Sequence, residues 1–218
     1  MSTHKFFFIH NYKVLGTTIY SQLPYSYNKL FNGYRTINDI IDKNPGIQLN
    51  KLPNIDLDKK MSIDHLHIDV IIALGLIKIP LKEIKFMMIM RDPIERFVSI
   101  CNYQAMIHEK GRQKRAKEVF FQDGNTMEKN IANLKNNIGD NFYQHKFVKN
   151  KNNINVELFK MEDKIGIINF FNQFGINMNL DIKKNVSIKK YNICDISHED
   201  MMFLKKFYKE DYDLYNSI

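Results

Sequence analysis

The chain has few cysteines and no long apolar segment, and both absences restrict its class. Only two cysteines, Cys101 and Cys194, occur in 218 residues, which gives neither a disulfide framework nor a cysteine metal motif and suits a reducing compartment. The longest apolar runs, Val70–Ile77 and Phe86–Met90, fall far short of the ~20 residues that a membrane-spanning helix needs. The N-terminal run Phe6–Ile9 is too short for the apolar part of a signal peptide. We therefore expect a cytoplasmic protein with no membrane partner.

Internal repeats and linkers rich in Gly, Pro or Ser are also lacking. The length of 218 residues fits one globular domain, so residues 1–218 are expected to form a single domain. Hydrophobic residues make up 44% of the chain and charged residues 26%, which excludes bulk disorder.

Basic residues outnumber acidic ones by 32 to 24, which gives a net charge of +8. This excess favours an anionic partner, such as a nucleotide, a nucleic acid, an acidic glycan or a membrane surface. The sequence contains no aromatic-rich RNA-binding motif, zinc finger or heptad array. A dedicated nucleic-acid-binding module is therefore not favoured.

Apolar runs alternate with helical patterns along the chain, which predicts an α/β domain. The predicted strands are Lys5–His10, Lys85–Met90 and Asn155–Phe159. The predicted helices are Thr17–Leu23, Ile37–Ile41, His67–Leu76, Asp92 to about Glu109, Met127–Asn137, Asp163–Phe174 and Ser197–Tyr208. We expect a mainly parallel central sheet flanked by helices in three layers. Because ligands bind beyond the carboxyl ends of such strands, the informative segments are Asn11–Thr18 and Arg91–Ser99.

The segment after the first predicted strand has the composition of an anion-binding loop. Gly16 allows a close backbone approach, and the helix start that follows it presents unpaired N–H groups. Thr17 and Thr18 add hydroxyl donors, and Lys13 adds a positive charge. The GxxxxGK[ST] spacing of a Walker A loop is absent. The alternative is purely structural, with Thr17 as a helix cap, Gly16 in a turn and Lys13 in solvent.

The segment after the second predicted strand begins a helix with a strong start signal. Asp92 is a good N-cap, Pro93 suits the first helical position, and Glu95 is expected to complete a capping box. Helical folding does not explain Arg91 at the strand end or Ser99 two turns into the helix. A guanidinium and a hydroxyl suit a phosphate, whereas the alternatives are an ion pair of Arg91 with Asp92 or Glu95 and a surface hydroxyl at Ser99.

Helical spacing also assigns the two sides of this helix. The expected buried face carries Ile94, Phe97, Val98 and Cys101, and the expected outer side carries Arg96, Ser99 and Tyr103.

Two segments together resemble a known enzyme family. Residues 86–103, FMMIMRDPIERFVSICNY, resemble the 3′-phosphate-binding segment of carbohydrate sulfotransferases that use 3′-phosphoadenosine 5′-phosphosulfate (PAPS). Residues 6–23, FFFIHNYKVLGTTIYSQL, resemble the family's 5′-phosphosulfate loop. Tyr12 stands where proline is usual, and Val14 and Leu15 place two residues between Lys13 and Gly16 where one is common. The C-terminal segments 185–187 and 197–215 also resemble the family's closing part.

The resemblance implies a P-loop-like three-layer fold, PAPS as cosubstrate and a carbohydrate hydroxyl as acceptor, with a tyrosine or small alcohol left open. It implies that Lys13, Gly16, Thr17 and Thr18 hold the 5′-phosphosulfate. It also implies that Arg91 and Ser99 bind the 3′-phosphate. No metal is implied by the resemblance.

A histidine pair upstream of the second strand supplies a candidate general base. His65 and His67 share one face if the segment is extended, and histidine takes a proton readily near neutral pH. The pattern is similar to the uronyl 2-O-sulfotransferases, whose base is the second histidine, which implies His67 with His65 as a helper. Buried structural histidines, a metal site with Asp64 or Asp69, and a base at Glu83 or Glu95 are the alternatives.

Two rival functions remain open at the level of the sequence. One is a phosphoryl-transferring nucleotide kinase, which the missing Walker A spacing and the lack of an evident magnesium carboxylate disfavour. The other is a non-catalytic nucleotide- or glycan-binding protein, which the altered first loop favours. The basic run 108–115 and the pair Lys189 and Lys190 are candidate contacts to an acidic acceptor and to the nucleotide, or else solvated charges.

Overall fold

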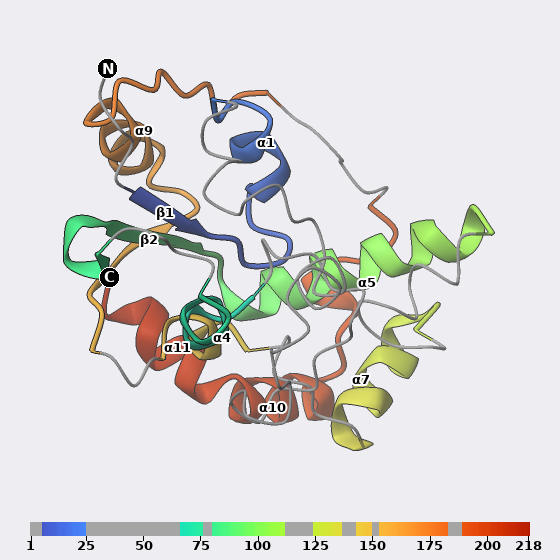
Figure 1. The fold of residues 1–218 in the computed structure, drawn as a ribbon. Helices are drawn as coiled ribbons and strands as arrows, with labels where there is room; N and C mark the ends of the chain where they lie inside the picture. The colour runs from blue at the N-terminus through green and yellow to red at the C-terminus, as the bar shows by residue number, and fades with distance from the viewer. Residues whose placement is uncertain are drawn as a thin grey trace. The chain divides into compact units, whose positions relative to one another are not determined.

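A computed structural model describes residues 6–24, 66–75, 80–111, 124–136, 143–149, 153–182 and 189–218. The chain divides into two compact units. Unit 1 comprises Met1–Met90 and Lys146–Lys184, and unit 2 comprises Arg91–His145 and Asn185–Ile218. Each unit is considered by itself below, with the elements labelled in Figure 1.

Unit 1 contains a parallel sheet whose described strands are β1 (Phe6–Ile9), β2 (Lys85–Met90) and β3 (Val156–Lys160), in the order β1-β2-β3. Phe7 pairs with Phe86 and Ile9 with Met88, and β3 continues the parallel pairing on the other side of β2. The expected α/β class and parallel sheet are therefore confirmed, and β1 and β2 lie side by side in Figure 1.

The apolar composition of the strands explains their position in the sheet. All four residues of β1 and five of the six residues of β2 are buried, which is typical of a parallel sheet covered on both faces. Only Lys85, at the start of β2, is exposed, and its ammonium donates to Gln173 Oε1 at 2.8 Å. The residues of β3 are half-buried.

Helices α1 (Gly16–Tyr20) and α9 (Lys164–Asn172) pack on one face of β1. Phe6 and Phe8 point to the same face because strand side chains alternate. Phe6 meets Phe171 edge-on with ring centroids 5.5 Å apart, and Phe8 lies 5.5 Å from Tyr20. Unit 1 also contains α4 (Ile68–Ala73) and the 3-10 helix η4 (Leu81–Glu83). Aromatic packing thus fixes β1 against α1 and α9.

Unit 2 is helical in its described part. It contains α5 (Pro93–Glu109), α7 (Met127–Asn136), η6 (Ile193–Asp195), α10 (His198–Phe207) and α11 (Lys209–Asn216). Its core is formed by apolar side chains of α5, α7 and α10, including Ile94, Phe97, Val98, Cys101, Ile131, Leu134 and Leu204. The predicted buried face of α5 is confirmed.

The expected outer side of α5 is partly wrong. Ser99 and Tyr103 are half-buried, but Arg96 is 0% exposed. Arg96 lies close enough to Tyr208, in unit 2, for its positive charge to lower the pKa of the Tyr208 phenol. The burial of Tyr208 has a larger effect and raises the same pKa. Helical periodicity alone placed Arg96 on the outer side of α5, whereas the folded chain buries it.

Most predicted elements are present, with ends that shift by a few residues. The ends of β1 and β3 differ by one residue from the predicted ends, and β2 has the predicted ends. The predicted helix Thr17–Leu23 begins one residue earlier and ends at Tyr20, and the predicted helix His67–Leu76 spans Ile68–Ala73. The predicted helix Ile37–Ile41 lies outside the described residues. The short α8 (His145–Val148) and all of α11 were not predicted.

Within the described ranges, none of the helices is both long and apolar enough to cross a membrane.

Candidate functional site

The two informative segments follow neighbouring strands of one sheet. Ile9, the last residue of β1, pairs with Met88, two residues before β2 ends. Because the strands are parallel, the chain leaves both of them at the same edge. The Met90 carbonyl accepts from Met161 N at 2.7 Å, which fixes the end of β2 against the chain that follows β3. The loop after β1 and the segment that begins with Arg91 therefore both start from the carboxyl edge of the sheet.

The loop after β1 has an unusual backbone. Lys13 and Leu15 adopt φ values of 62° and 50°, in the left-handed region that favours glycine. Leu15 is the N-cap of α1 and makes no side-chain capping bond. Thr17 lies inside the first turn of α1, so the alternative in which Thr17 caps the helix is wrong. These two left-handed residues make the loop turn sharply, and the side chain of Lys13 is half-buried.

Gly16 is required by a close contact within unit 1. A Cβ at this position would overlap the imidazole of His10. The His10 ring is buried, with its centroid 5.9 Å from that of Phe8 and 5.1 Å from that of Tyr20. The glycine thus lets α1 start directly against the end of β1, and this close approach accounts for it without a ligand.

The two threonines of the loop lie in different environments. Thr18 is buried and its hydroxyl donates to the Ile182 carbonyl at 3.1 Å, while Gln22 Nε2 donates to the Thr18 carbonyl at 2.9 Å. Thr17 is exposed. Thr18 therefore ties the loop to the segment after α9, and Thr17 is the threonine that presents its side chain to solvent.

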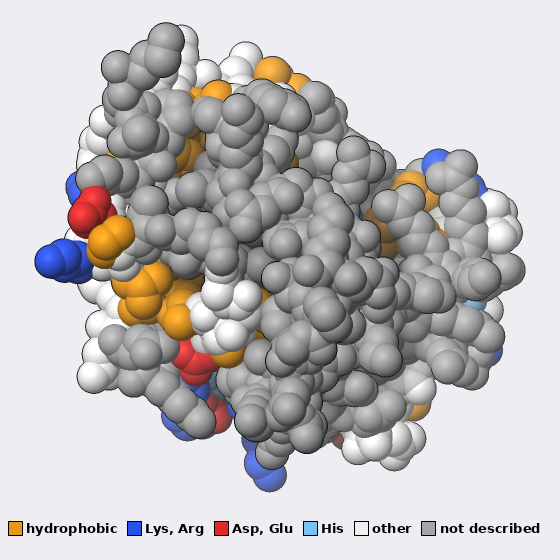
Figure 2. Space-filling view, viewed as in Figure 1, with side chains coloured by type: hydrophobic (Ala, Val, Ile, Leu, Met, Phe, Trp, Pro, Cys, Tyr) orange, Lys and Arg blue, Asp and Glu red, His pale blue; other side chains and the backbone are white. Residues whose placement is uncertain are grey.

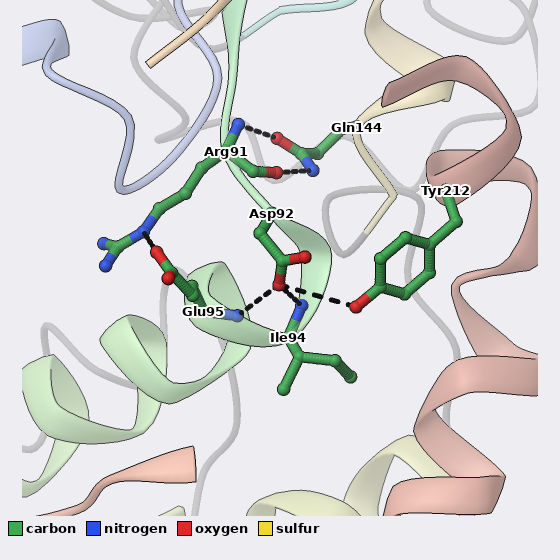
Figure 3. A network of polar contacts seen from close by, with 6 residues as sticks. All are labelled: Arg91, Asp92, Ile94, Glu95, Gln144 and Tyr212. Carbon is green, nitrogen blue, oxygen red and sulfur yellow. Dashed lines mark hydrogen bonds and ion pairs between the residues drawn. The ribbon is translucent and has the colours of Figure 1, made fainter. Parts of the chain in front are cut away.

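Arg91 is held by two side chains of unit 2. Its Nε donates to Glu95 Oε2 at 3.3 Å, one turn along α5. The Glu95 carboxylate is thus engaged with Arg91, and the capping box expected of it is not formed. Figure 3 shows that the bond to Glu95 uses Nε, with the two terminal guanidinium nitrogens on its far side. The ion pair anticipated as an alternative is present, and it leaves the outer edge of the guanidinium facing away from Glu95.

The backbone of Arg91 is bound by Gln144, a residue that the sequence patterns did not single out. Arg91 N donates to Gln144 Oε1 at 3.1 Å, and Gln144 Nε2 donates to the Arg91 carbonyl at 2.7 Å. Gln144 is completely buried. No sequence signal marked this contact, since the two residues are 53 positions apart.

Asp92 caps α5 as predicted and also reaches the C-terminal helix. Its Oδ1 accepts from Ile94 N at 2.9 Å and from Glu95 N at 3.0 Å. The Tyr212 hydroxyl donates to the same oxygen at 3.4 Å (Figure 3). Burial and, secondarily, the Asp92 carboxylate raise the pKa of Tyr212 well above its ordinary value, so the phenol remains a donor at neutral pH.

His67, the candidate base, lies at the start of α4 with an extended backbone. It is buried, and its ring centroid lies 4.6 Å from that of Phe147. Tyr12, from the first loop, meets the same Phe147 ring edge-on at 6.3 Å. One aromatic ring thus brings His67 and the first loop together in unit 1. His65 and Asp64, which were considered as a helper and a metal ligand, lie outside the described residues.

The candidate closing residue Lys190 is fixed to α5. The Asn102 side chain accepts from Lys190 N at 2.7 Å and from Tyr191 N at 2.8 Å, and it donates to the Tyr191 carbonyl at 3.0 Å. The Lys190 ammonium lies 3.1 Å from Glu109 Oε1. This hydrogen bond is the main reason that the pKa of Lys190 is raised, and the lysine is paired as it stands. Lys189 is exposed.

Figure 2 shows how charge is distributed over one face of the molecule. The lysine and arginine side chains visible among the described residues stand singly, with hydrophobic and acidic side chains among them.

Comparisons with known proteins give no match. No family model matches the chain, and neither a curated protein nor a solved structure does. The function of the protein therefore has to be inferred from the residues and contacts of this chain.

Proposed function

We propose that the protein is a PAPS-dependent sulfotransferase that moves a sulfuryl group from PAPS to an acceptor hydroxyl, on a carbohydrate by resemblance. The observation that carries the proposal is the parallel pairing of β1 and β2. This pairing starts the Lys13 loop and the Arg91 segment from the same edge of one sheet. A P-loop-like fold, with nucleotide binding beyond that edge, is part of the proposal.

In the proposed reaction, the acceptor hydroxyl attacks the sulfur while the bond from sulfur to the 5′-phosphate oxygen breaks. The acceptor proton goes to a base, and adenosine 3′,5′-bisphosphate leaves with the negative charge. Such a transfer requires in-line positioning and donors aimed at the leaving oxygen. Lys13 and the amides around Gly16, Thr17 and Thr18 are the donors we assign to the 5′-phosphosulfate. The left-handed turn at Lys13 and Leu15 supports this role because such turns present successive backbone N–H groups.

The 3′-phosphate is assigned to Arg91 and Ser99. The Arg91 guanidinium has a bound inner edge and an outer edge that faces away from Glu95, an arrangement suited to gripping a phosphate with its terminal nitrogens. Ser99 lies two helical turns after Asp92, the N-cap of α5, and is half-buried.

His67 is assigned as the base that takes the acceptor proton, with His65 as a helper. The shared contact of His67 and Tyr12 with Phe147 supports this assignment, because a base must lie close to the group that transfers. We expect His67→Ala to lower turnover by about 10² to 10⁴ and to leave nucleotide affinity unchanged. Full turnover in His67→Ala would show that another group is the base.

Nucleotide binding tests the proposal directly. Adenosine 3′,5′-bisphosphate at about a hundredfold excess over its Kd is expected to stabilise the protein by about 2.7 kcal/mol. This corresponds to a rise in Tm of about 5 to 10 °C for a chain of this size. ATP with magnesium should give a smaller shift, and an equal or larger shift would contradict the proposal. Transfer of radiolabelled sulfate from PAPS to a panel of glycans then tests catalysis.

A non-catalytic binding protein on the same fold is the second candidate. It is favoured by two features of the first loop: the left-handed Leu15 and the Thr18 hydroxyl, which already donates to the Ile182 carbonyl. Such a protein would bind adenosine 3′,5′-bisphosphate, and no glycan in the panel would accept sulfate. Nucleotide binding without transfer would therefore support this candidate over the enzyme.

A further inference from the structure

The backbone of Arg91 is bound in the way that one strand binds another. The carboxamide of Gln144 offers one acceptor and one donor, and both are used on the N–H and C=O of Arg91, at 3.1 and 2.7 Å (Figure 3). These two bonds restrict rotation about the backbone of Arg91, where the chain leaves β2. In the described part of unit 2, the backbone of Arg91 has no backbone hydrogen-bond partner that does this instead.

Gln144 is itself fixed by a carboxylate from the C-terminal helix. Asp211, on α11, is completely buried. Its two oxygens accept from Gln144 N and His145 N, each at 2.8 Å, and Oδ1 also meets His145 Nδ1 at 2.6 Å. A chain of contacts therefore runs from α11 through Gln144 to the peptide group of Arg91, entirely within unit 2.

The histidine in this cluster is poorly placed to be a catalytic base. An imidazole oriented by a buried carboxylate is a familiar arrangement for proton transfer. Both ring nitrogens of His145 face carboxylates, however, since Nδ1 meets Asp211 and Nε2 lies 3.3 Å from Glu210 Oε2. This pairing of both nitrogens does not suit a base that takes a proton from a substrate hydroxyl, and the cluster is better explained as a support for its neighbours.

Stability alone does not account for such a polar support. Burying an amide and a carboxylate costs free energy that hydrogen bonds only partly offset, and apolar side chains fill the same space at no such cost. What the polar chain adds is a fixed orientation. Gln144 holds the backbone of Arg91 and Glu95 holds its Nε, so little conformational freedom is left to lose when an anion binds the outer edge.

We propose that Gln144, braced by Asp211, is a positioning residue that orients Arg91 for the 3′-phosphate of the nucleotide. This inference rests on the proposed function. It predicts that Gln144 acts on one part of the ligand only, namely the phosphate that Arg91 grips. The measurable quantity is the ratio of two affinities, for adenosine 3′,5′-bisphosphate and for adenosine 5′-phosphate, which lacks the 3′-phosphate.

Titration calorimetry on the full chain gives this ratio for the wild type and for Gln144→Met, which keeps the side-chain length and removes both bonds to Arg91. We expect the ratio to fall about tenfold, the order seen when an outer hydrogen-bond partner of a binding group is removed, with little change in affinity for adenosine 5′-phosphate. Arg91→Ala should lower the same ratio at least as far. Adding Gln144→Met to Arg91→Ala should lower it no further.

Gln104→Met is the matched control, because Gln104 is also completely buried in unit 2 and lies well inside α5, away from the start of that helix. It is expected to leave the ratio unchanged even if it lowers Tm. If Gln144→Met does not fold, the affinity ratio is measured for Gln144→Glu instead. This variant keeps the acceptor for Arg91 N and loses the donor to the Arg91 carbonyl. The ratio should then fall to an intermediate value.

Two outcomes contradict different statements. If Arg91→Ala lowers the ratio and the Gln144 variants do not, Gln144 is merely structural and the inference fails while the proposed function stands. If the wild type binds the two nucleotides equally well, the proposed 3′-phosphate site does not exist, and both statements fail.

Discussion

Leu15 has a backbone conformation that the first loop, residues 11–18, imposes on it. Its φ of 50° places it where an L-residue with a branched side chain is disfavoured by about 1 to 2 kcal/mol relative to the right-handed region. The family that this segment resembles commonly has one residue between lysine and glycine. Here a leucine occupies the left-handed position and Gly16 follows it.

We predict that Leu15→Gly stabilises the protein by about 0.5 kcal/mol, because relief of the left-handed strain exceeds the entropy cost of glycine in the unfolded chain. Urea unfolding measures the change. Leu23→Gly is the control, since Leu23 is equally half-buried and does not have a positive φ, and it should destabilise. A loss of stability in Leu15→Gly would show that the leucine side chain matters more than the turn.

Arg96 illustrates the limit of reasoning from one residue at a time. Its position on the helical wheel placed it on the outer side of α5, yet it is fully buried. The prediction used only the period of α5. Tyr208, whose pKa the Arg96 charge lowers, is more than a hundred positions away in the sequence, and helical periodicity carries no information about such distant residues.

At the scale of elements, α10 has a start that depends on a reciprocal pair. Ser197 Oγ accepts from Asp200 N at 3.1 Å and donates to Asp200 Oδ2 at 2.7 Å. This hydrogen bond from Ser197, more than the ion pair with Lys135 at 3.1 Å, lowers the pKa of Asp200. The carboxylate form is therefore the one that the folded helix prefers.

A lowered carboxyl pKa stabilises the fold at a pH above its ordinary value of about 4, and this contribution is lost as the pH falls through the folded-state pKa. We predict that Ser197→Ala costs about 1 kcal/mol at pH 7 and less at pH 3. Urea unfolding at the two pH values checks this. Ser217→Ala, at the exposed end of α11, should cost little at either pH. A cost of Ser197→Ala that is constant with pH would contradict the role of Asp200.

The start of α5 is the best predicted element and α11 the least. Asp92 and Pro93 signal a helix start through local chemistry, and Asp92 caps α5 through two backbone amides. The sequence of α11, KEDYDLYN, is mostly charged and has no clear apolar period. Its only fully buried side chain is the carboxylate of Asp211, a residue that any pattern of hydrophobicity assigns to solvent.

At the scale of the whole molecule, the division into two units predicts two regions of distinct stability. The sheet and α9 belong to unit 1, and the helical core around Leu204 belongs to unit 2. Groups of elements with a core of their own commonly open as separate cooperative units.

We predict that Leu204→Ala, which empties part of the unit 2 core, costs about 2 to 5 kcal/mol and speeds hydrogen exchange in α5, α7 and α10 more than in the strands. Ile167→Ala on α9, where the side chain is equally buried, should have the opposite pattern, with faster exchange in β1 and β2. Exchange measured by mass spectrometry distinguishes these results. Equal acceleration throughout by both variants would show a single cooperative unit.

The sequence by itself determined the strands, the start of α5, the apolar face of α5 and the two segments that leave the sheet edge. These features depend on neighbouring residues, through apolar runs, capping and helical period. Only the tertiary structure decided that Arg96 is buried and that the peptide group of Arg91 is bound by Gln144, which Asp211 braces. Such contacts join polar groups 53 and 67 positions apart. They form because packing excludes water from those groups, and no local pattern records which segments packing will bring together.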